Sequence, residues 1–187
     1  MHPDVVELRE FYDSSLGQVA RRIIRRRIRE FWPDTRALTV LGLGYAIPYL
    51  RPFLDESART LAVMPAEQGV ERWPAEGPSI VALATENRIP LPDAAVDYLL
   101  IVHGVEATSS PDALLGEAWR VLSATGRLLV VVPNRSGLWA RADHTAFGHG
   151  HPYSQSQLMR LLKQASFVPE RWERGLFVPP YRRRFLL

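Results

Sequence analysis

Residues 39–49 read TVLGLGYAIPY, an apolar run that leads into two closely spaced glycines. The apolar run predicts a buried strand, and Gly42 and Gly44 predict a tight loop directly after it. A glycine loop between a strand and a helix lets the backbone approach a ligand closely, and the free amides of that helix can hold an anionic group. We therefore place a candidate nucleotide-like cofactor site at this point of the chain.

The composition is that of one folded domain. Of the 187 residues, 47% are hydrophobic and 23% are charged. We expect a single domain over residues 1–187, with an N-terminal helical segment at 1–35 and an α/β core at 36–187. The absence of cysteine excludes disulfides and thiolate metal sites. Because no apolar run is long enough for a membrane span and no secretory signal is present, we expect a cytoplasmic protein.

Apolar runs recur along the chain with helical patterns or loops between them, which predicts an α/β fold with a mostly parallel sheet. Most runs are continuous rather than alternating, as in strands that are covered on both faces. The expected strands are Ala37–Leu43, Thr60–Met64, Ser79–Ala84, Val96–Val102 and Arg127–Val132, with an antiparallel edge formed from Phe167–Glu173, Gly175–Val178 and Phe185–Leu187.

Helical patterns occupy the segments between these strands. Pro111–Leu122 and Ser154–Ala165 each carry an apolar stripe with helical spacing, and Ser154 is a suitable N-cap. Only one or two turns fit around Ala66–Trp73. The segment Val5–Trp32 is typical of one or two helices that have an apolar face and an opposite, arginine-rich face.

The arginines within Arg21–Arg29 leave two interpretations open. The first is a solvated face of a helix that packs on the sheet. The second is a surface that contacts a nucleic acid, a protein or an anionic membrane. The formal net charge of +3 is modest, so the overall charge does not choose between them.

Four later phrases of the sequence carry a family resemblance. They are residues 89–100 (IPLPDAAVDYLL), 102–106 (VHGVE), 114–130 (LLGEAWRVL and GRLLV) and 151–167, which begins HPYS. In their order and spacing they resemble the class I S-adenosylmethionine-dependent methyltransferases. The resemblance covers about residues 37–173 and implies a Rossmann-like, doubly wound sheet of about seven strands with helices on both faces. It also implies methyl transfer from S-adenosylmethionine to an acceptor of unknown identity, most simply a small molecule.

The resemblance further implies where the cofactor would bind. The expected contacts lie at the carboxyl ends of the strands, near the place where the strand order reverses. They are Gly42, Leu43, Gly44, Tyr45 and Ala46 after the first strand, Met64 at the end of the second, Thr85 and Glu86 after the third, and His103 after the fourth.

Four positions depart from the family pattern. Gly42 stands where the family carries an acidic residue, and Ala46 and Pro48 replace two glycines. Met64 stands where the family has a carboxylate that accepts both ribose hydroxyls. Proline has no amide hydrogen, although it fits the first turn of a helix. These departures support the alternative of a methyltransferase-like protein that no longer catalyses and serves as a binding or partner module.

His103 is the candidate catalytic base, because it follows the fourth strand at the expected ligand-binding edge. Its alternative role is structural, as part of the pocket floor. Tyr12, Phe147 and Tyr153 are the candidates for substrate contacts or a lid. The spacing of the histidines between residues 144 and 151 matches no established ligand pattern, so we expect no metal site.

Overall fold

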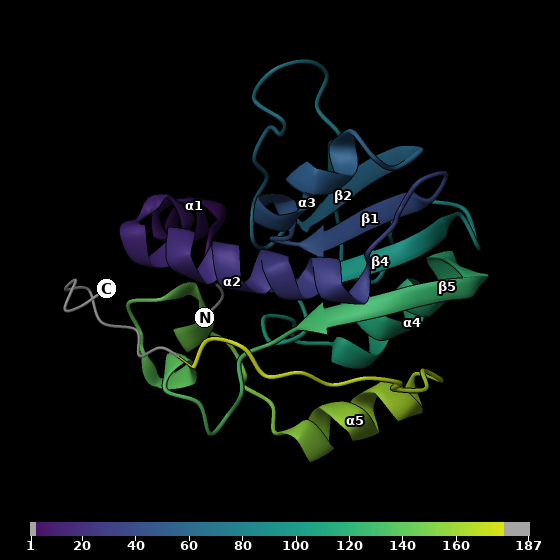
Figure 1. The fold of residues 1–187 in the computed structure, drawn as a ribbon. Coiled ribbons are helices and arrows are strands. Elements are labelled where there is room, and N and C mark those ends of the chain that lie inside the picture. The colour runs from purple at the N-terminus through teal and green to yellow at the C-terminus, as the bar shows by residue number, and fades with distance from the viewer. Residues whose placement is uncertain (1–2, 178–187) are drawn as a thin grey trace.

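The computed structural model describes residues 3–177, which form a five-stranded sheet with helices on both faces (Figure 1). The strands are β1 (Thr39–Gly44), β2 (Arg59–Pro65), β3 (Val81–Ala84), β4 (Val96–Val102) and β5 (Leu122–Val131). Their order is β3-β2-β1-β4-β5, and all neighbours are parallel. The order reverses between β1 and β4, so the prediction of a doubly wound α/β fold is confirmed.

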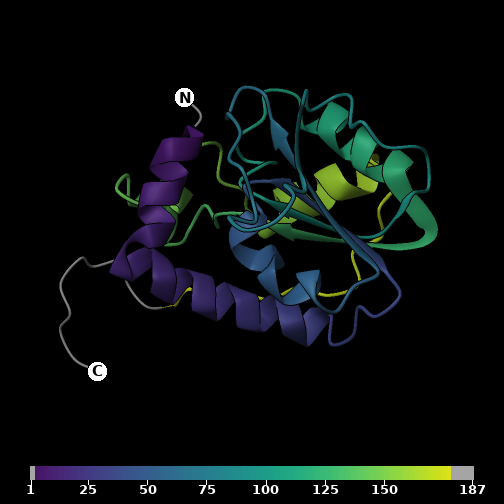
Figure 2. The ribbon, with the colours of Figure 1, turned by 90° about the horizontal axis from the view of Figure 1, so that it is seen from above.

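Helices cover the two faces of the sheet in separate groups (Figures 1 and 2). One face carries α2 (Ser15–Phe31) and α3 (Ile47–Leu54), and the other carries α4 (Pro111–Val121) and α5 (Gln155–Gln164), while α1 (Val5–Asp13) lies next to α2 beyond the carboxyl ends of the strands. Strand β4 serves both layers, because Leu100 and Val102 join the first core cluster while Leu99 and Ile101 join the second. This two-sided burial explains the continuous apolar runs of the sequence.

The N-terminal segment forms two helices, as predicted. Asp4 caps α1 through a capping box with Glu7, and Ser14 both ends α1 and caps α2. The buried face of α2 includes Ile24 and Ile28. Arg22, Arg25 and Arg26 lie on the opposite side, where the side chain of Arg26 is 83% exposed. Arg29 is half-buried instead, because it pairs with Glu56 and lies 5.5 Å from the ring centroid of Phe53.

The expected seven strands and antiparallel edge are wrong for the described part of the chain, since residues 167–177 contain no strand. Side chains hold this segment in place of a hydrogen-bond ladder. Glu170 pairs with Arg127 at 2.6 Å, the Arg171 guanidinium lies 4.4 Å from the ring centroid of Phe31, and Trp172 packs against a core cluster. Pro169 has no amide hydrogen for a ladder. The other expected edge residues, Val178 and Phe185–Leu187, lie outside the described residues.

Two further expectations concern the connection after β2 and the membrane. The chain makes a single hydrogen-bonded turn there, in which Gln68 and Gly69 both donate to the Pro65 carbonyl. This agrees with the short turn expected around Ala66–Trp73.

Within residues 3–177, no helix has both the length and the apolar character that a membrane crossing needs.

Candidate functional site

The carboxyl ends of β1 and β4 meet at Gly44. The amide of Tyr45 donates to the Val102 carbonyl at 2.8 Å, and Gly44 has a φ of 77°. A Cβ atom at Gly44 would lie 2.3 Å from the Val102 carbonyl oxygen. Only glycine accommodates both this backbone conformation and this close approach, so the predicted glycine loop lies at the reversal of strand order, where ligands bind in such folds.

The unusual residues of this loop have local explanations. Pro48 lies in the first turn of α3, where a missing amide hydrogen is tolerated. A Cβ atom at Gly42 would lie 2.7 Å from a Leu50 methyl and 2.8 Å from the Ala46 Cβ. Helix α3 therefore packs against the strand where an acidic side chain would otherwise stand. Met64 is fully buried in the same core cluster, so the thioether at the end of β2 is part of the core.

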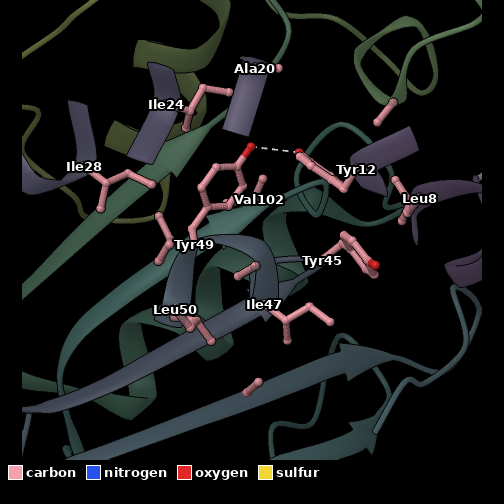
Figure 3. Packing of buried hydrophobic residues seen from close by; sticks show 14 of the residues in the cluster. Leu8, Tyr12, Ala20, Ile24, Ile28, Tyr45, Ile47, Tyr49, Leu50 and Val102 are labelled. Atoms are coloured by element: carbon pink, nitrogen blue, oxygen red, sulfur yellow. Dashed lines mark hydrogen bonds between the residues drawn. The ribbon is translucent and has the colours of Figure 1, made fainter. Parts of the chain in front are cut away.

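A chain of polar side chains crosses this edge inside the protein. The hydroxyl of Tyr12 lies 2.8 Å from the hydroxyl of Tyr49 and 2.8 Å from His103 Nε2. His103 Nδ1 lies 3.2 Å from Glu106 Oε1. Figure 3 shows Tyr12 and Tyr49 pointing toward one another from α1 and α3. The network thus joins the N-terminal helix to the end of β4.

The backbone holds His103 in an unusual position. Its φ of 50° lies in the left-handed region, which is uncommon and costly for a residue other than glycine. The Gln68 side-chain amide donates to the His103 carbonyl at 2.8 Å, and the Val5 amide donates to the Gln68 carbonyl at 2.8 Å. The loop after β2 therefore connects α1 with the end of β4.

Aromatic rings surround the network. The Phe147 ring centroid lies 4.9 Å from that of His103, and Phe147 also meets Phe11 at 6.1 Å. The Tyr45 ring stacks on Tyr12 at 5.8 Å. The structure thus brings together four residues that were predicted from separate parts of the sequence, namely Tyr12, Tyr45, His103 and Phe147.

Other predicted site residues lie elsewhere. The Tyr153 hydroxyl donates to the Val105 carbonyl at 3.4 Å, and its ring packs with the opposite core cluster, so Tyr153 is not part of the aromatic group around Tyr12. Thr85 lines an open pocket of about 760 Å³ together with Ile89 and Leu91. Glu86 accepts a hydrogen bond from the Thr108 hydroxyl. Asp97 accepts from the Thr39 amide at 2.8 Å, so it ties the start of β4 to the start of β1.

Three residues of the network were missed by the sequence analysis. Gln68, Glu106 and Tyr49 are all buried here. Gln68 and Glu106 follow strand ends, which is the one signal that would have singled them out. Their importance comes from contacts with residues that are distant in the sequence. Among residues 3–177, no group of three or more acidic or histidine side chains is arranged to hold a metal ion.

The buried tyrosines allow a prediction about alkaline pH. Burial raises the pKa of Tyr12, Tyr45 and Tyr49 above the ordinary value of 10.0. Because the unfolded chain titrates at the ordinary value, these residues stabilise the fold fully below that pH, and the contribution is lost as the pH rises further. A spectrophotometric titration should therefore show these three tyrosines ionising only as the protein unfolds. Ionisation of all tyrosines at their ordinary pKa in a folded protein would contradict this.

Comparison with known proteins points to one family. Residues 41–130, from β1 through most of β5, match the family model of a methyltransferase domain. No curated protein matched the chain. A solved methyltransferase from Thermotoga maritima, described as dependent on S-adenosylmethionine, superposes with a TM-score of 0.65 at 18% identity, over 88% of this chain and 78% of that one.

Two further solved structures show the same fold. One is the methyltransferase from Haloferax volcanii in complex with the Trm112 methyltransferase activator, with a TM-score of 0.63, 17% identity and coverage of 84% and 75% of the two chains. The other is the 1,6-didemethyltoxoflavin-N1-methyltransferase from Burkholderia thailandensis, solved with bound 1,6-didemethyltoxoflavin and S-adenosylhomocysteine. Its TM-score is 0.56, with 16% identity and coverage of 85% and 70%.

Proposed function

Because the chain belongs to the class I S-adenosylmethionine-dependent methyltransferase family, we propose that it transfers a methyl group from S-adenosylmethionine to a small-molecule acceptor. The observation that supports this most directly is the pairing of Gly44 with Val102, the residue before His103, at the carboxyl ends of β1 and β4. This is the place where the strand order reverses and where open α/β sheets bind their ligands.

Two features of the edge fit the cofactor. A Cβ atom at Gly44 would collide with the backbone at Val102 and Gly104, so this position requires glycine, and glycine lets the backbone approach a ligand closely. Gln68, on the loop after β2, has a buried Oε1 atom without a hydrogen-bond partner. This oxygen could accept from a ribose hydroxyl, in place of the carboxylate that is missing at Met64. Tyr45, Thr85, Glu86 and His103 are the other proposed contacts.

The cofactor would supply an electrophilic methyl group, and the protein would hold the acceptor in the correct position relative to that group. Methyl transfer needs the acceptor atom in line with the methyl carbon, so orientation provides much of the rate. The aromatic side chains of Tyr45 and Phe147 would exclude water and orient a flat acceptor. His103 would take a proton from the acceptor through Nε2, because Glu106 lies at Nδ1 on the other side of the ring.

A titration with S-adenosylmethionine and S-adenosylhomocysteine tests this proposal. Calorimetry on the full chain is expected to show binding in the micromolar range, about −8 kcal/mol in free energy. Absence of binding at millimolar cofactor would contradict the enzyme and support the alternative of a noncatalytic binding module. Micromolar binding would exclude a noncatalytic module that has lost the ability to bind the cofactor.

The macromolecular partner of this protein and its location in the cell remain predictions from the sequence. The arginine-rich face of α2 is the proposed surface for a nucleic acid or an acidic protein, because it is solvent-exposed and because a neighbour of this fold is complexed with a protein activator. Electrostatic binding of RNA would weaken steeply with added salt in a gel shift, and a shift that does not respond to salt would argue against it. Recovery in the soluble cytoplasmic fraction would support the expected location.

A further inference from the structure

The Tyr12 side chain fills a closed aromatic site at the carboxyl end of β4. Its ring is nearly parallel to that of Tyr45, with centroids 5.8 Å apart and 22° between the planes. The rings of Phe11 and Tyr49 meet it edge-on, at 5.0 Å and 5.8 Å. Tyr12 is only 3% exposed. The site therefore already holds one flat phenol, which the chain itself provides (Figure 3).

The hydroxyl of this phenol meets a buried polar pair. It lies 2.8 Å from His103 Nε2, and His103 Nδ1 lies 3.2 Å from Glu106 Oε1. When Nδ1–H donates to the Glu106 carboxylate, Nε2 keeps its lone pair and accepts from the Tyr12 hydroxyl. The Tyr49 hydroxyl can then donate to the Tyr12 oxygen. In this arrangement a buried hydroxyl group donates directly to His103 Nε2.

The packing of α1 against the rest of the protein does not require the buried pair of His103 and Glu106. Leu8 and Phe11 already bury one face of α1 in the core. Burying a histidine and a carboxylate costs free energy unless all their polar atoms are paired, and Glu106 Oε2 has no hydrogen-bond partner. A buried ionisable pair that is incompletely satisfied, at the edge where ligands bind, is typical of a functional site.

We propose that Tyr12 stands in the methyl-acceptor site, and that the acceptor is an aromatic compound with a hydroxyl group. The inference rests on the proposed function. The acceptor ring would stack on Tyr45, and its hydroxyl would take the bonds now made by Tyr12. As the hydroxyl oxygen bonds to the methyl carbon, the donor's carbon–sulfur bond breaks with its electrons on sulfur. The hydroxyl proton passes to His103 Nε2, and Glu106 stabilises the imidazolium.

Exchange of Tyr12 for the acceptor involves a short part of the chain. Tyr12 is the penultimate residue of α1, which ends where Ser14 begins to cap α2. When the ring leaves, the protein loses the stacking on Tyr45 and the bonds to His103 and Tyr49. An acceptor must offset these losses, so it binds the wild-type protein less tightly than a variant without the Tyr12 ring.

Phenol binding to the full chain tests the inference, with toluene as the matched ligand that lacks a hydroxyl. Tyr12→Ala is expected to bind phenol about tenfold more tightly than the wild type does, and about fivefold more tightly than it binds toluene, because a buried hydrogen bond distinguishes the two ligands. Calorimetry at neutral pH measures these affinities. In the double variant Tyr12→Ala/His103→Phe, the preference for phenol should disappear.

A more conservative variant at Tyr12 and a cavity made elsewhere in the core show whether the effects on phenol binding arise from the site itself or from impaired folding. Tyr12→Phe retains the ring but loses its hydrogen bonds, so the ring leaves more easily and phenol should bind about fivefold more tightly than to the wild type. Phe53→Ala opens a cavity at a fully buried ring and should bind toluene at least as well as phenol. The proposal is overturned if Tyr12→Ala shows no preference for phenol, or if Tyr12→Phe binds phenol no better than the wild type.

The two proposals fail in different ways. If the chain does not bind S-adenosylmethionine while Tyr12→Ala still prefers phenol, the proposed function fails and the aromatic hydroxyl site remains. If the cofactor binds and the phenol preference is absent, the acceptor class is wrong and the proposed function remains. When both hold, formation of methoxybenzene from phenol by the loaded protein should depend on His103.

Discussion

Replacing Gly44 with alanine is expected to lower the free energy of unfolding by about 3 kcal/mol and to abolish binding of S-adenosylmethionine. The φ of 77° is unfavourable for any residue with a Cβ atom. In addition, the new atom would lie 2.3 Å from the Val102 carbonyl oxygen. Since this contact is with backbone, β1 and β4 would have to separate at the proposed cofactor site. Urea unfolding and cofactor calorimetry measure the two effects.

Gly77→Ala is the matched control for this substitution. Gly77 has a similar φ of 82°, but a Cβ atom there would meet nothing within 4 Å. The control therefore isolates the backbone strain, which should cost about 1 kcal/mol and leave cofactor binding unchanged. Equal losses of stability in the two variants would show that the contact between Gly44 and Val102 contributes nothing.

The substitution Gly17→Ala is expected to separate α1 from α2 and to lower the free energy of unfolding by about 2–3 kcal/mol. A Cβ atom at Gly17 would lie 1.9 Å from the Phe11 carbonyl oxygen and 2.8 Å from the Tyr12 Cα. The last turn of α1 must therefore move, and the Tyr12 ring must move with it. Hydrogen exchange should show faster exchange of the α1 amides, and phenol should bind more tightly.

Gly116→Ala is the matched control, because it makes the same substitution in a helix at a position where the new Cβ atom has no close neighbour. Gly116 lies in α4, and a Cβ atom there would meet nothing within 4 Å. Alanine in an exposed helical position is favoured over glycine, so this variant should gain about 0.5–1 kcal/mol. If Gly17→Ala stabilised the protein to the same degree, with unchanged exchange in α1, the close packing of α1 on α2 would be refuted.

The candidate site was predictable only in part. Gly44 and His103 could be placed at one edge because each follows an apolar run, and parallel strands end on the same side. Tyr12 and Phe147 were expected near that edge, and both lie there. Tyr153 was expected with them, but the residues after β5 direct it to the opposite core cluster. Glu106 and Gln68 were not predicted, because nothing in their local pattern shows which side chains they meet.

The amino-acid sequence by itself determined the class of fold and indicated the edge of the sheet at which we propose that the cofactor binds. Continuous apolar runs specify strands that are buried on both faces, and the closely spaced Gly42 and Gly44 indicate where the first of these strands ends. These are local properties, carried by residues that are neighbours in the chain. Their order and spacing were enough to indicate the family.

Only the tertiary structure decided how that edge is filled. Gly44, which indicated the cofactor site in the sequence, lies beside β4. The side chain that fills this edge is Tyr12, which precedes Gly44 by 32 positions in the chain. The absence of further strands in residues 167–177 is also a tertiary result, since side-chain contacts replace a ladder there. Such contacts join residues that are far apart in the sequence, and their free energy depends on geometry that no local pattern records.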